Sequence, residues 1–494
     1  MEYNTLIKRY IGILLSLLLS MTACDSILGD NEDPLATTDD QIKERPEALF
    51  VGVLTSLSSD RVLGTNVFNR WSQHYVGASF SDEDNFNVPD FPQSVTWPVY
   101  YASVIKNTIL GERAAASVNR RNVQAQYEIM RAYAFYHLTL MFEQVPFSEV
   151  MDFDGEDLNT RYPHYENQQE IFEGVIETLD AAMSRINTND TDAIKEEDLL
   201  YNGNMVRWMQ FANSLKIKTL MLLSGKDDSY HAALEAAFGQ SYIDAIEEEA
   251  IFHYGSTLAN ANQFYKLHKQ FADGQSQFFF ASEPFVDMLL SQVDPRLWVF
   301  YDYGTDATSV IHTGMEPGST AAFTITSVLS LNYISATSPD LWLTASEMYL
   351  LHAEAMLKGW INGDATQAHE LYLEGIRMNF NRINSLEAVI NNGETVGESR
   401  INSYLEDVPV LNFLSNDRAI NAVYYQAYVE RFNRGLDAWT FVRRTGFPDR
   451  PLPVNSALSD HITRLPYPAD ERSSNENIPE QPLLDDLMWF MPIE

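Results

Sequence analysis

The sequence has a single cysteine in 494 residues and is short of basic side chains. One cysteine excludes an internal disulfide and any metal site built from several thiolates. Only 33 lysines and arginines stand against 69 aspartates and glutamates, a formal charge of −36. Without a basic excess the chain is a poor partner for nucleic acid and has no general attraction for anionic lipid. The acidic balance favours a neutral or cationic ligand, or serves only solubility.

Catalytic motifs are missing as well. The chain contains no G-x-S-x-G elbow, no H-E-x-x-H, no P-loop and no G-x-G-x-x-G. A carboxylate pair of the glycosidase type depends on separation in space, which a count of acidic residues leaves open. The sequence therefore predicts a binding protein and not an enzyme.

Aromatic residues are plentiful. They make up 12% of the chain and apolar residues 45%, as in a folded globular protein. Aromatic rings together with acidic side chains suit neutral sugars, because rings stack on the apolar faces of pyranoses while carboxylates and amides bind hydroxyls. For any single ring, a place in the core is the commoner alternative.

Residues 1–23 have the organisation of a bacterial export signal. Lys8 and Arg9 precede an apolar stretch from Ile11 to Leu19, which is too short to span a bilayer comfortably as a helix. The stretch ends at the only cysteine, Cys24. This ending resembles a lipobox, in which the cysteine is acylated and becomes the mature N-terminus. An ordinary cleaved signal peptide is the alternative, and we expect lipidation of Cys24.

Residues 24–40 are acidic and broken by proline, which predicts a flexible tether. The acids that follow the cysteine resemble the export signal of Bacteroidetes lipoproteins that reach the outside of the cell; they are Asp25, Asp30, Glu32 and Asp33. We therefore expect a lipid-anchored protein of the outer membrane that is exposed on the cell surface.

Apolar residues recur at helical spacing along most of the remaining chain. The spacing predicts helices at 41–59, 97–118, 124–142, 167–186, 204–223, 346–360, 365–382, 417–432 and 436–444. Their grouping resembles tetratricopeptide-type hairpins, with pairs near 95–145, 166–224, 340–385 and 415–445. The fold class is therefore mainly α, with residues 41–494 forming a single domain.

Two stretches break this pattern. Residues 225–340 combine short aromatic or β-branched runs with Gly, Ser, Asp and Pro, which predicts a loop-rich insertion with a few short strands. Long excursions on a helical scaffold often carry binding surfaces. The segment 448–494 has eight prolines, too many for helix, and we expect it to wrap the surface.

Candidate ligand residues lie in the aromatic loop between 71 and 91 and in the insertion. The rings chosen for stacking are Trp71, Tyr75, Phe86 and Tyr301, with Tyr303 next. The side chains chosen for sugar hydroxyls are Asp82, Asn85 and Asn87. An aromatic loop with this much polarity is either a binding platform or a cap over the core.

The stretch from Tyr425 to Pro448 mixes charges with large apolar residues. It reads as helical runs on either side of Gly435, and its charges are Glu430, Arg431, Arg434, Asp437, Arg443 and Arg444. An active site has this appearance, but structural ion-pair networks are commoner, because buried charges must be partnered wherever they occur.

No cofactor is expected. Asp152, Asp154 and Asp157 bring oxygen ligands together and are the one candidate for calcium, although their spacing departs from the EF-hand loop and an acidic turn is the alternative. The histidines show no ligand spacing, and core or surface roles are expected for His74, His137, His253 and His352.

Several blocks together resemble the SusD/RagB family of Bacteroidetes outer-membrane nutrient-binding lipoproteins, in particular its SusD-like branch. The blocks are Arg131–Leu138 with Gln144–Ser148, Trp208–Lys216, Asp294–Leu297, Ser346–Ala355, Gly435–Pro448 and Arg464–Pro468. They are spread over nearly the whole mature chain in the family's order, which makes the set specific although each block alone is weak.

The resemblance implies about four tetratricopeptide-like helix pairs that support a variable, loop-rich ligand region. Members of this family form lids over a SusC-like TonB-dependent transporter and capture oligosaccharides for import during polysaccharide utilisation. RagB-like members are linked to peptides, so capture of oligopeptides with the same architecture is the alternative. The resemblance assigns a bracing role to Glu347, Glu354, Arg431 and Arg443, and it carries over no ligand residue.

Overall fold

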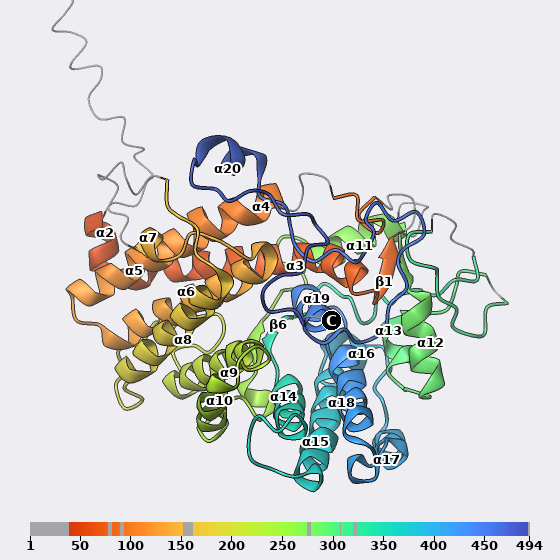
Figure 1. Cartoon of the computed structure of the whole chain (residues 1–494). Coiled ribbons are helices and arrows are strands. Elements are labelled where there is room, and N and C mark those ends of the chain that lie inside the picture. Colours follow the sequence, from red (N-terminus) through yellow and green to blue (C-terminus); the bar gives the residue numbers. More distant parts are fainter. Residues whose placement is uncertain are drawn as a thin grey trace, which may run out of the picture. The chain divides into compact units, whose positions relative to one another are not determined.

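A computed structural model describes residues 39–77, 82–88, 93–151, 162–273, 278–306, 308–319 and 324–492 (Figure 1). The chain divides into an N-terminal unit that ends at Arg45 and a main unit, Pro46–Glu494. In the described part of the N-terminal unit, α2 (Asp39–Glu44) is the regular element. The signal segment, Cys24 and most of the tether lie outside the described residues.

The main unit is helical for most of its length, as predicted. It opens with a 3-10 turn, η1 (Pro46–Leu49), followed by α3 (Phe50–Trp71). The single helix expected over 41–59 is therefore interrupted, because a proline disfavours helical geometry at the residue before it. The region expected as one helix over 97–118 consists of α4 (Gln93–Pro98), a π-helical segment η2 (Val99–Ile105) and α5 (Lys106–Ser117).

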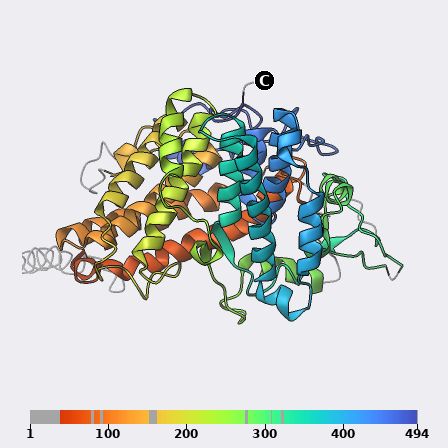
Figure 2. The ribbon, with the colours of Figure 1, turned by 90° about the horizontal axis from the view of Figure 1, so that it is seen from below.

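The four predicted helix pairs are present. The first is α5 with α6 (Arg121–Phe142), and the second is α8 (Gln168–Arg185) with α9 (Met205–Ser224). The third is α14 (Ala345–Leu357) with α15 (Ala365–Asn384), and the fourth is α18 (Asn416–Glu430) with α19 (Gly435–Thr445). Successive pairs also contact each other, α6 with α8 and α14 with α18, so the pairs form a continuous helical layer (Figures 1 and 2).

Local signals in the sequence begin these helices. Asn167 caps α8 and Asp364 caps α15, and in both a side chain three residues into the helix completes a capping box. Asn204 caps α9 by accepting hydrogen bonds from the first turn. At the other end, α19 stops at Gly446, which has a φ of 68° and forms the left-handed cap typical of glycine.

The insertion between the second and third pairs is more regular than the sequence predicted. Its helices are α10 (His231–Phe238), α11 (Gln263–Asp273), α12 (Glu283–Ser291) and α13 (Leu297–Phe300). The prediction missed them because each is too short to show the repeated apolar spacing on which it relied. After the third pair come α16 (Glu387–Asn391) and α17 (Glu398–Asp407).

Short strands connect the insertion to the rest of the main unit. An antiparallel sheet has the order β1 (Tyr75–Gly77), β3 (Phe279–Ala281), β5 (Val328–Leu329) and β4 (Tyr301–Asp302). A second pair joins β2 (Ala250–Phe252) to β6 (Asp340–Leu343). Because β1 follows α3 and pairs with β3, the first sheet brings the middle of the insertion against the N-terminal part of the main unit (Figure 1).

The C-terminal segment lies against the helices and has one short helix, α20 (Ala469–Ser474), in its described part. Leu465 N donates to Met141 O of α6 (2.8 Å), and Trp439 Nε1 of α19 donates to Ile462 O (3.2 Å). None of the helices in the described part of the chain is both long enough and apolar enough to cross a membrane.

Candidate functional site

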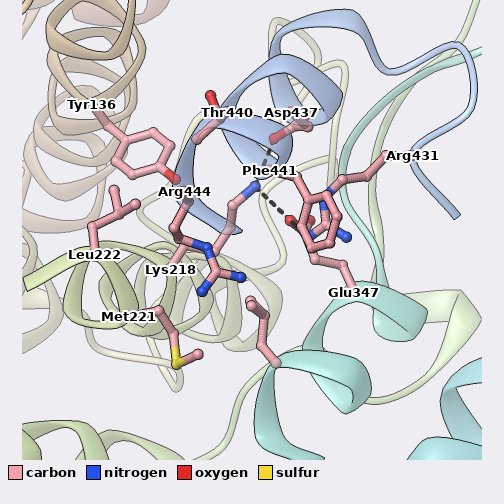
Figure 3. Close-up of a pocket in the computed structure, with 11 residues that line it drawn as sticks. Tyr136, Lys218, Met221, Leu222, Glu347, Arg431, Asp437, Thr440, Phe441 and Arg444 are labelled. Carbon is pink, nitrogen blue, oxygen red and sulfur yellow. Dashed lines mark hydrogen bonds and ion pairs between the residues drawn. The ribbon is translucent and has the colours of Figure 1, made fainter. Parts of the chain in front are cut away.

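The charged residues around α19 form a buried ion-pair network. Glu347 of α14 accepts hydrogen bonds from Arg431 Nη2 (2.8 Å) and Arg434 Nη2 (2.7 Å). Lys218 of α9 lies between two carboxylates, with its Nζ 2.9 Å from Glu347 and 2.7 Å from Asp437 (Figure 3). All five side chains are buried. The network therefore fastens α9, α14, α18 and α19 together.

Burial alone would raise the pKa of Glu347, but the cations Arg434, Lys218 and Arg431 lower it to about 2. Asp437 behaves in the same way: burial opposes ionisation, and Lys218, Arg434 and Arg61 hold its pKa well below the usual range. The two carboxylates are therefore charged at any physiological pH and are poorly suited to proton transfer.

The space inside this network is too small for a ligand. The cavity lined by Tyr136, Lys218, Glu347 and their neighbours has a volume of about 30 Å³ (Figure 3), which suffices for one or two waters. Of the two interpretations of the stretch from Tyr425 to Pro448, the structure supports the ion-pair network.

The four residues to which the resemblance gave a bracing role are used in two ways. Glu347 accepts a hydrogen bond from Arg431. The two carboxylate oxygens of Glu354 accept hydrogen bonds from the two terminal nitrogens of Arg444 (2.6 and 2.7 Å). Arg443 has no carboxylate partner among the described residues. It donates to the backbone carbonyls of Leu140 (2.8 Å) and Thr463 (2.7 Å), and burial lowers its pKa.

Four of the five predicted stacking rings lie in the core. Trp71, Tyr75, Phe86 and Tyr301 are each at most 2% exposed. The Trp71 ring packs against Trp439 and Tyr75 stacks on Phe264. A ring whose faces are covered by other rings offers no surface to a sugar, so we correct this part of the prediction: these four rings belong to the core.

Some polar side chains of the loop between β1 and α4 already bind other parts of the protein. The Asn85 amide donates to Val454 O (2.8 Å), which ties the loop to the C-terminal segment. Asp82 and Asn87 are exposed. The neighbouring Asp84, which the sequence did not single out, is buried, pairs with Arg70 and accepts a hydrogen bond from Gly77 N (2.8 Å). Ligand contact by Asp82, Asn85 and Asn87 stays a prediction.

Exposed rings gather at one place on the insertion. We call Trp298, Tyr303, His312 and Arg400 the ring cluster. Trp298 is 38% exposed and Tyr303 43%. The Tyr303 ring stacks on His312 with centroids 4.4 Å apart, and Trp298 meets the edge of His312 at 6.0 Å. Arg400 comes from α17, and its guanidinium carbon lies 4.7 Å from the Trp298 centroid.

The electrostatics of the ring cluster are simple. Burial lowers the pKa of His312 to about 4, so this ring is neutral at physiological pH. Arg400 supplies the cluster's cation. Val310 and Ile311, which precede His312 in the chain, are exposed apolar side chains. The arrangement presents aromatic faces and a cationic donor to solvent, which suits a ligand with both apolar faces and hydroxyl groups.

Sequence reasoning found one member of the ring cluster, Tyr303, and missed three. Trp298 lies in the same aromatic run as Tyr301, but only Trp298 faces solvent. Arg400 lies about a hundred positions further along the chain in α17, and nothing in its local sequence links it to Trp298.

The described residues hold no group of three or more His, Cys, Asp or Glu side chains placed to bind a metal ion. Asp152, Asp154 and Asp157, the calcium candidates, lie outside the described residues. Two of the histidines are engaged in the core. His74 Nδ1 lies 2.9 Å from Asn69 Oδ1, and His137 Nδ1 lies 3.1 Å from Tyr133 O.

A protein-family model described as "Starch-binding associating with outer membrane" matches residues 38–468. The chain belongs to the SusD-like family. Membership supports a glycan-binding protein at the cell surface, since the family's description places its members at the outer membrane. Members of the SusD-like family are binding proteins without catalytic activity.

Solved structures share this fold. A chitin-binding protein aligns with a TM-score of 0.75 and 22% identity, over 87% of this chain and 94% of its own. A SusD homologue from Bacteroides uniformis aligns with a TM-score of 0.74 and 18% identity, over 91% and 99%. A SusD-like protein of Bacteroidetes gives 0.74 and 19%, over 88% and 96%. None of the curated protein sequences matches the chain.

Proposed function

We propose that this protein is a non-catalytic surface lipoprotein that captures oligosaccharides on the ring cluster and delivers them to a SusC-like TonB-dependent transporter. The observation that carries the proposal is the pair of exposed rings, Trp298 and Tyr303, on a SusD-like fold. Aromatic side chains with one open face and one supported face bind pyranose rings by burying their apolar faces.

The contacts within the ring cluster support binding without a large rearrangement. His312 holds Tyr303 from one side, and its own Nδ1 lies 3.1 Å from Ser327 Oγ, next to β5. Arg400 lies over Trp298, and among the described residues its guanidinium has no hydrogen-bond partner, so its donors can serve hydroxyl oxygens. Side chains fixed in this way lose less conformational entropy when a ligand binds.

The test is isothermal titration of the unlipidated protein with a panel of plant and host polysaccharides. For a polysaccharide that binds, we expect the double variant Trp298→Ala/Tyr303→Ala to weaken affinity by at least tenfold, about 1.4 kcal/mol. Phe413→Ala is the matched control, since this ring is 87% exposed on η6 (Leu411–Phe413), outside the cluster. It should leave affinity unchanged.

Two results would overturn the proposal. One is that no polysaccharide binds while oligopeptides do, which would favour the alternative of peptide capture; the formal charge of −36 would then favour basic peptides. The other is the release of reducing ends by the pure protein, which would make it an enzyme.

Delivery to a transporter has its own test. The lipidated protein, affinity-tagged and extracted from its own outer membranes in mild detergent, should bring with it a TonB-dependent transporter identifiable by mass spectrometry. Recovery of the protein without any such transporter, from cells that express one beside it, would contradict the partner assignment.

A further inference from the structure

Arg400 is the charged member of the ring cluster, and its contacts bear on the kind of sugar that the cluster would bind. It is exposed in the first turn of α17, and its guanidinium carbon lies 4.7 Å from the Trp298 centroid. Among the described residues its guanidinium has neither a hydrogen bond nor an ion pair. The buried Arg434, by contrast, is paired with Glu347. A ligand in solvent can therefore reach the donors of Arg400.

The carboxylates nearest to the ring cluster in sequence do not pair with Arg400. Glu398, two residues before it, lies 3.2 Å from Arg377 Nη1. Asp306 accepts hydrogen bonds from its own turn, and burial raises the pKa of Asp302 on β4, which opposes its charge. The positive charge of Arg400 is thus left without a carboxylate partner in the described part of the chain.

An unpaired guanidinium favours an oxyanion over the other groups that a sugar offers. Its N–H donors lie in one plane and match the two coplanar oxygens of a carboxylate, or two oxygens of a sulfate. Such charge-assisted hydrogen bonds are about twice as strong as those to a neutral hydroxyl. An amino sugar with an ammonium group would be repelled. The free donors of Arg400 therefore select an acidic sugar.

The net charge of the chain acts at longer range. The formal charge is −36, which opposes the approach of an acidic ligand. At physiological ionic strength, however, charges further away than about 8 Å are largely screened. Long-range repulsion slows association, whereas the groups in contact with the ligand govern how long it stays bound. At the ring cluster the local cation outweighs the overall charge from which the sequence favoured a neutral or cationic ligand.

We propose that the ring cluster selects acidic oligosaccharides, with one sugar ring stacked on Tyr303 and a carboxylate or sulfate group of the same chain bound to the guanidinium of Arg400. The contacts run from Tyr303 through His312 and Trp298 to Arg400, with successive separations of 4.4, 6.0 and 4.7 Å. An oligosaccharide of a few rings spans this distance. The inference rests on the proposed glycan binding and adds the class of glycan.

Isothermal titration of the unlipidated protein with two matched pairs of oligosaccharides tests the inference. The carboxylate pair is oligogalacturonate and its methyl-esterified, neutral counterpart. The sulfate pair is κ-carrageenan oligosaccharide and its desulfated counterpart. We expect the acidic member of at least one pair to bind at least tenfold more tightly than the neutral member, and the pair that shows this preference identifies the oxyanion.

Variants of Arg400 assign the preference to its guanidinium. Arg400→Gln should weaken binding of the acidic member at least tenfold more than binding of the neutral one. Arg400→Lys keeps the charge but loses the planar set of donors, so it should keep only part of the preference. Lys358→Gln is the matched control, because Lys358 Nζ also lies over a tryptophan, 5.1 Å from the Trp360 centroid, outside the ring cluster. It should leave the preference unchanged.

Failure of this inference can be told apart from failure of the proposed function. Neutral members that bind as tightly as the acidic ones, and lose affinity in Trp298→Ala/Tyr303→Ala, would overturn the acidic class and leave glycan capture on the ring cluster standing. A preference for the acidic member that survives Arg400→Gln would also overturn the inference. If no member of either pair binds, the inference fails, and the polysaccharide panel decides on the proposed function by itself.

Discussion

Glu347 shows what a single buried residue does in this fold. Its carboxylate meets Lys218, Arg431 and Arg434, all within 2.9 Å, and these come from different helices or the loop between them. Charges buried in this way are stable only when they are paired with opposite charges, because removing one partner leaves an uncompensated charge in the interior. The residue is therefore a structural requirement of the fold and no part of a ligand site.

The buried ion pairs of Glu347 make the stability of the folded protein depend on pH. The ordinary pKa of a glutamate is 4.5, and in the folded protein that of Glu347 is about 2. Because the folded-state pKa is depressed, its contribution is present above about pH 4.5 and is lost as the pH falls toward 2, a change on the order of 3 kcal/mol. We expect urea unfolding to show this loss, and Glu347→Gln to be less stable at pH 7 and flatter below pH 4.5.

Asp180→Asn is the control, since the Asp180 carboxylate is 49% exposed in its pair with Lys216 and the variant should keep the wild-type loss of stability below pH 4.5. Asp60 and Glu249 act in the opposite direction: burial raises the pKa of each to about 6, so their contribution is lost as the pH rises toward 6. A Glu347→Gln variant with the wild-type slope below pH 4.5 would contradict the assignment.

The candidate site shows the limit of sequence reasoning at the scale of residues. Trp298 and Tyr301 stand in one aromatic run, yet Tyr301 donates its hydroxyl to His74 O in the core while Trp298 is open to solvent. The run is too short for spacing to distinguish the two sides. What separates them is packing at the start of β4, where the Tyr301 ring meets Phe285 and Phe432 edge-on.

At the scale of elements, two glycines show how closely the helices approach. Gly111 of α5 lies against Tyr127 of α6, where an added Cβ would clash with the ring. Gly52 of α3 has open space in the same position. One glycine is therefore required by helix packing, while the other only lowers helix propensity.

We expect opposite effects from the same substitution at these two sites. Gly111→Ala should lower the free energy of unfolding by about 1–3 kcal/mol, because overpacking forces the helices apart. Gly52→Ala should raise it by up to about 1 kcal/mol, the propensity difference between the two residues. Urea denaturation of both variants measures the contrast. Equal and small effects would mean that α5 and α6 pack less tightly than described.

The elements themselves were largely predictable. The ends of α8, α9, α14, α15, α18 and α19 lie within a few residues of the predicted ones, because caps such as Asn167 and Asp364 and regular apolar spacing mark them locally. The short helices of the insertion, such as α11 and α12, were not predicted. Contacts between distant parts of the chain hold them: α11 packs against α3, outside the insertion, and α12 packs against α13 within it.

At the scale of the whole molecule, the proposed lipid anchor at Cys24 has the clearest consequence. The cysteine at position 24 is the only one in the chain, so a single substitution removes any lipid attachment. Multiple acyl chains hold a protein on a membrane stably, whereas an acidic protein without them has no attraction for anionic lipid.

We expect Cys24→Ala to move the protein from the membrane fraction to the soluble fraction, with folding unchanged. Immunoblotting of separated fractions measures the distribution, and protease treatment of intact wild-type cells tests exposure on the surface. A Ser26→Ala variant, two residues away, should stay with the membrane. Continued membrane association of the Cys24 variant would count against the lipid anchor.

The sequence by itself determined most of the paired helices, their pairing and the family. Helix spacing and caps are local signals, and the motif blocks that resemble the SusD-like family are read in order along the chain. Tertiary structure alone decided which rings are buried, which cations meet Glu347, and that Arg400 lies over Trp298 although the two stand far apart in sequence. The physical reason is that burial and pairing depend on contacts between distant segments, which no local pattern encodes. The charged stretch around α19 thus belongs to the scaffold, and the exposed rings of the insertion form the proposed ligand surface.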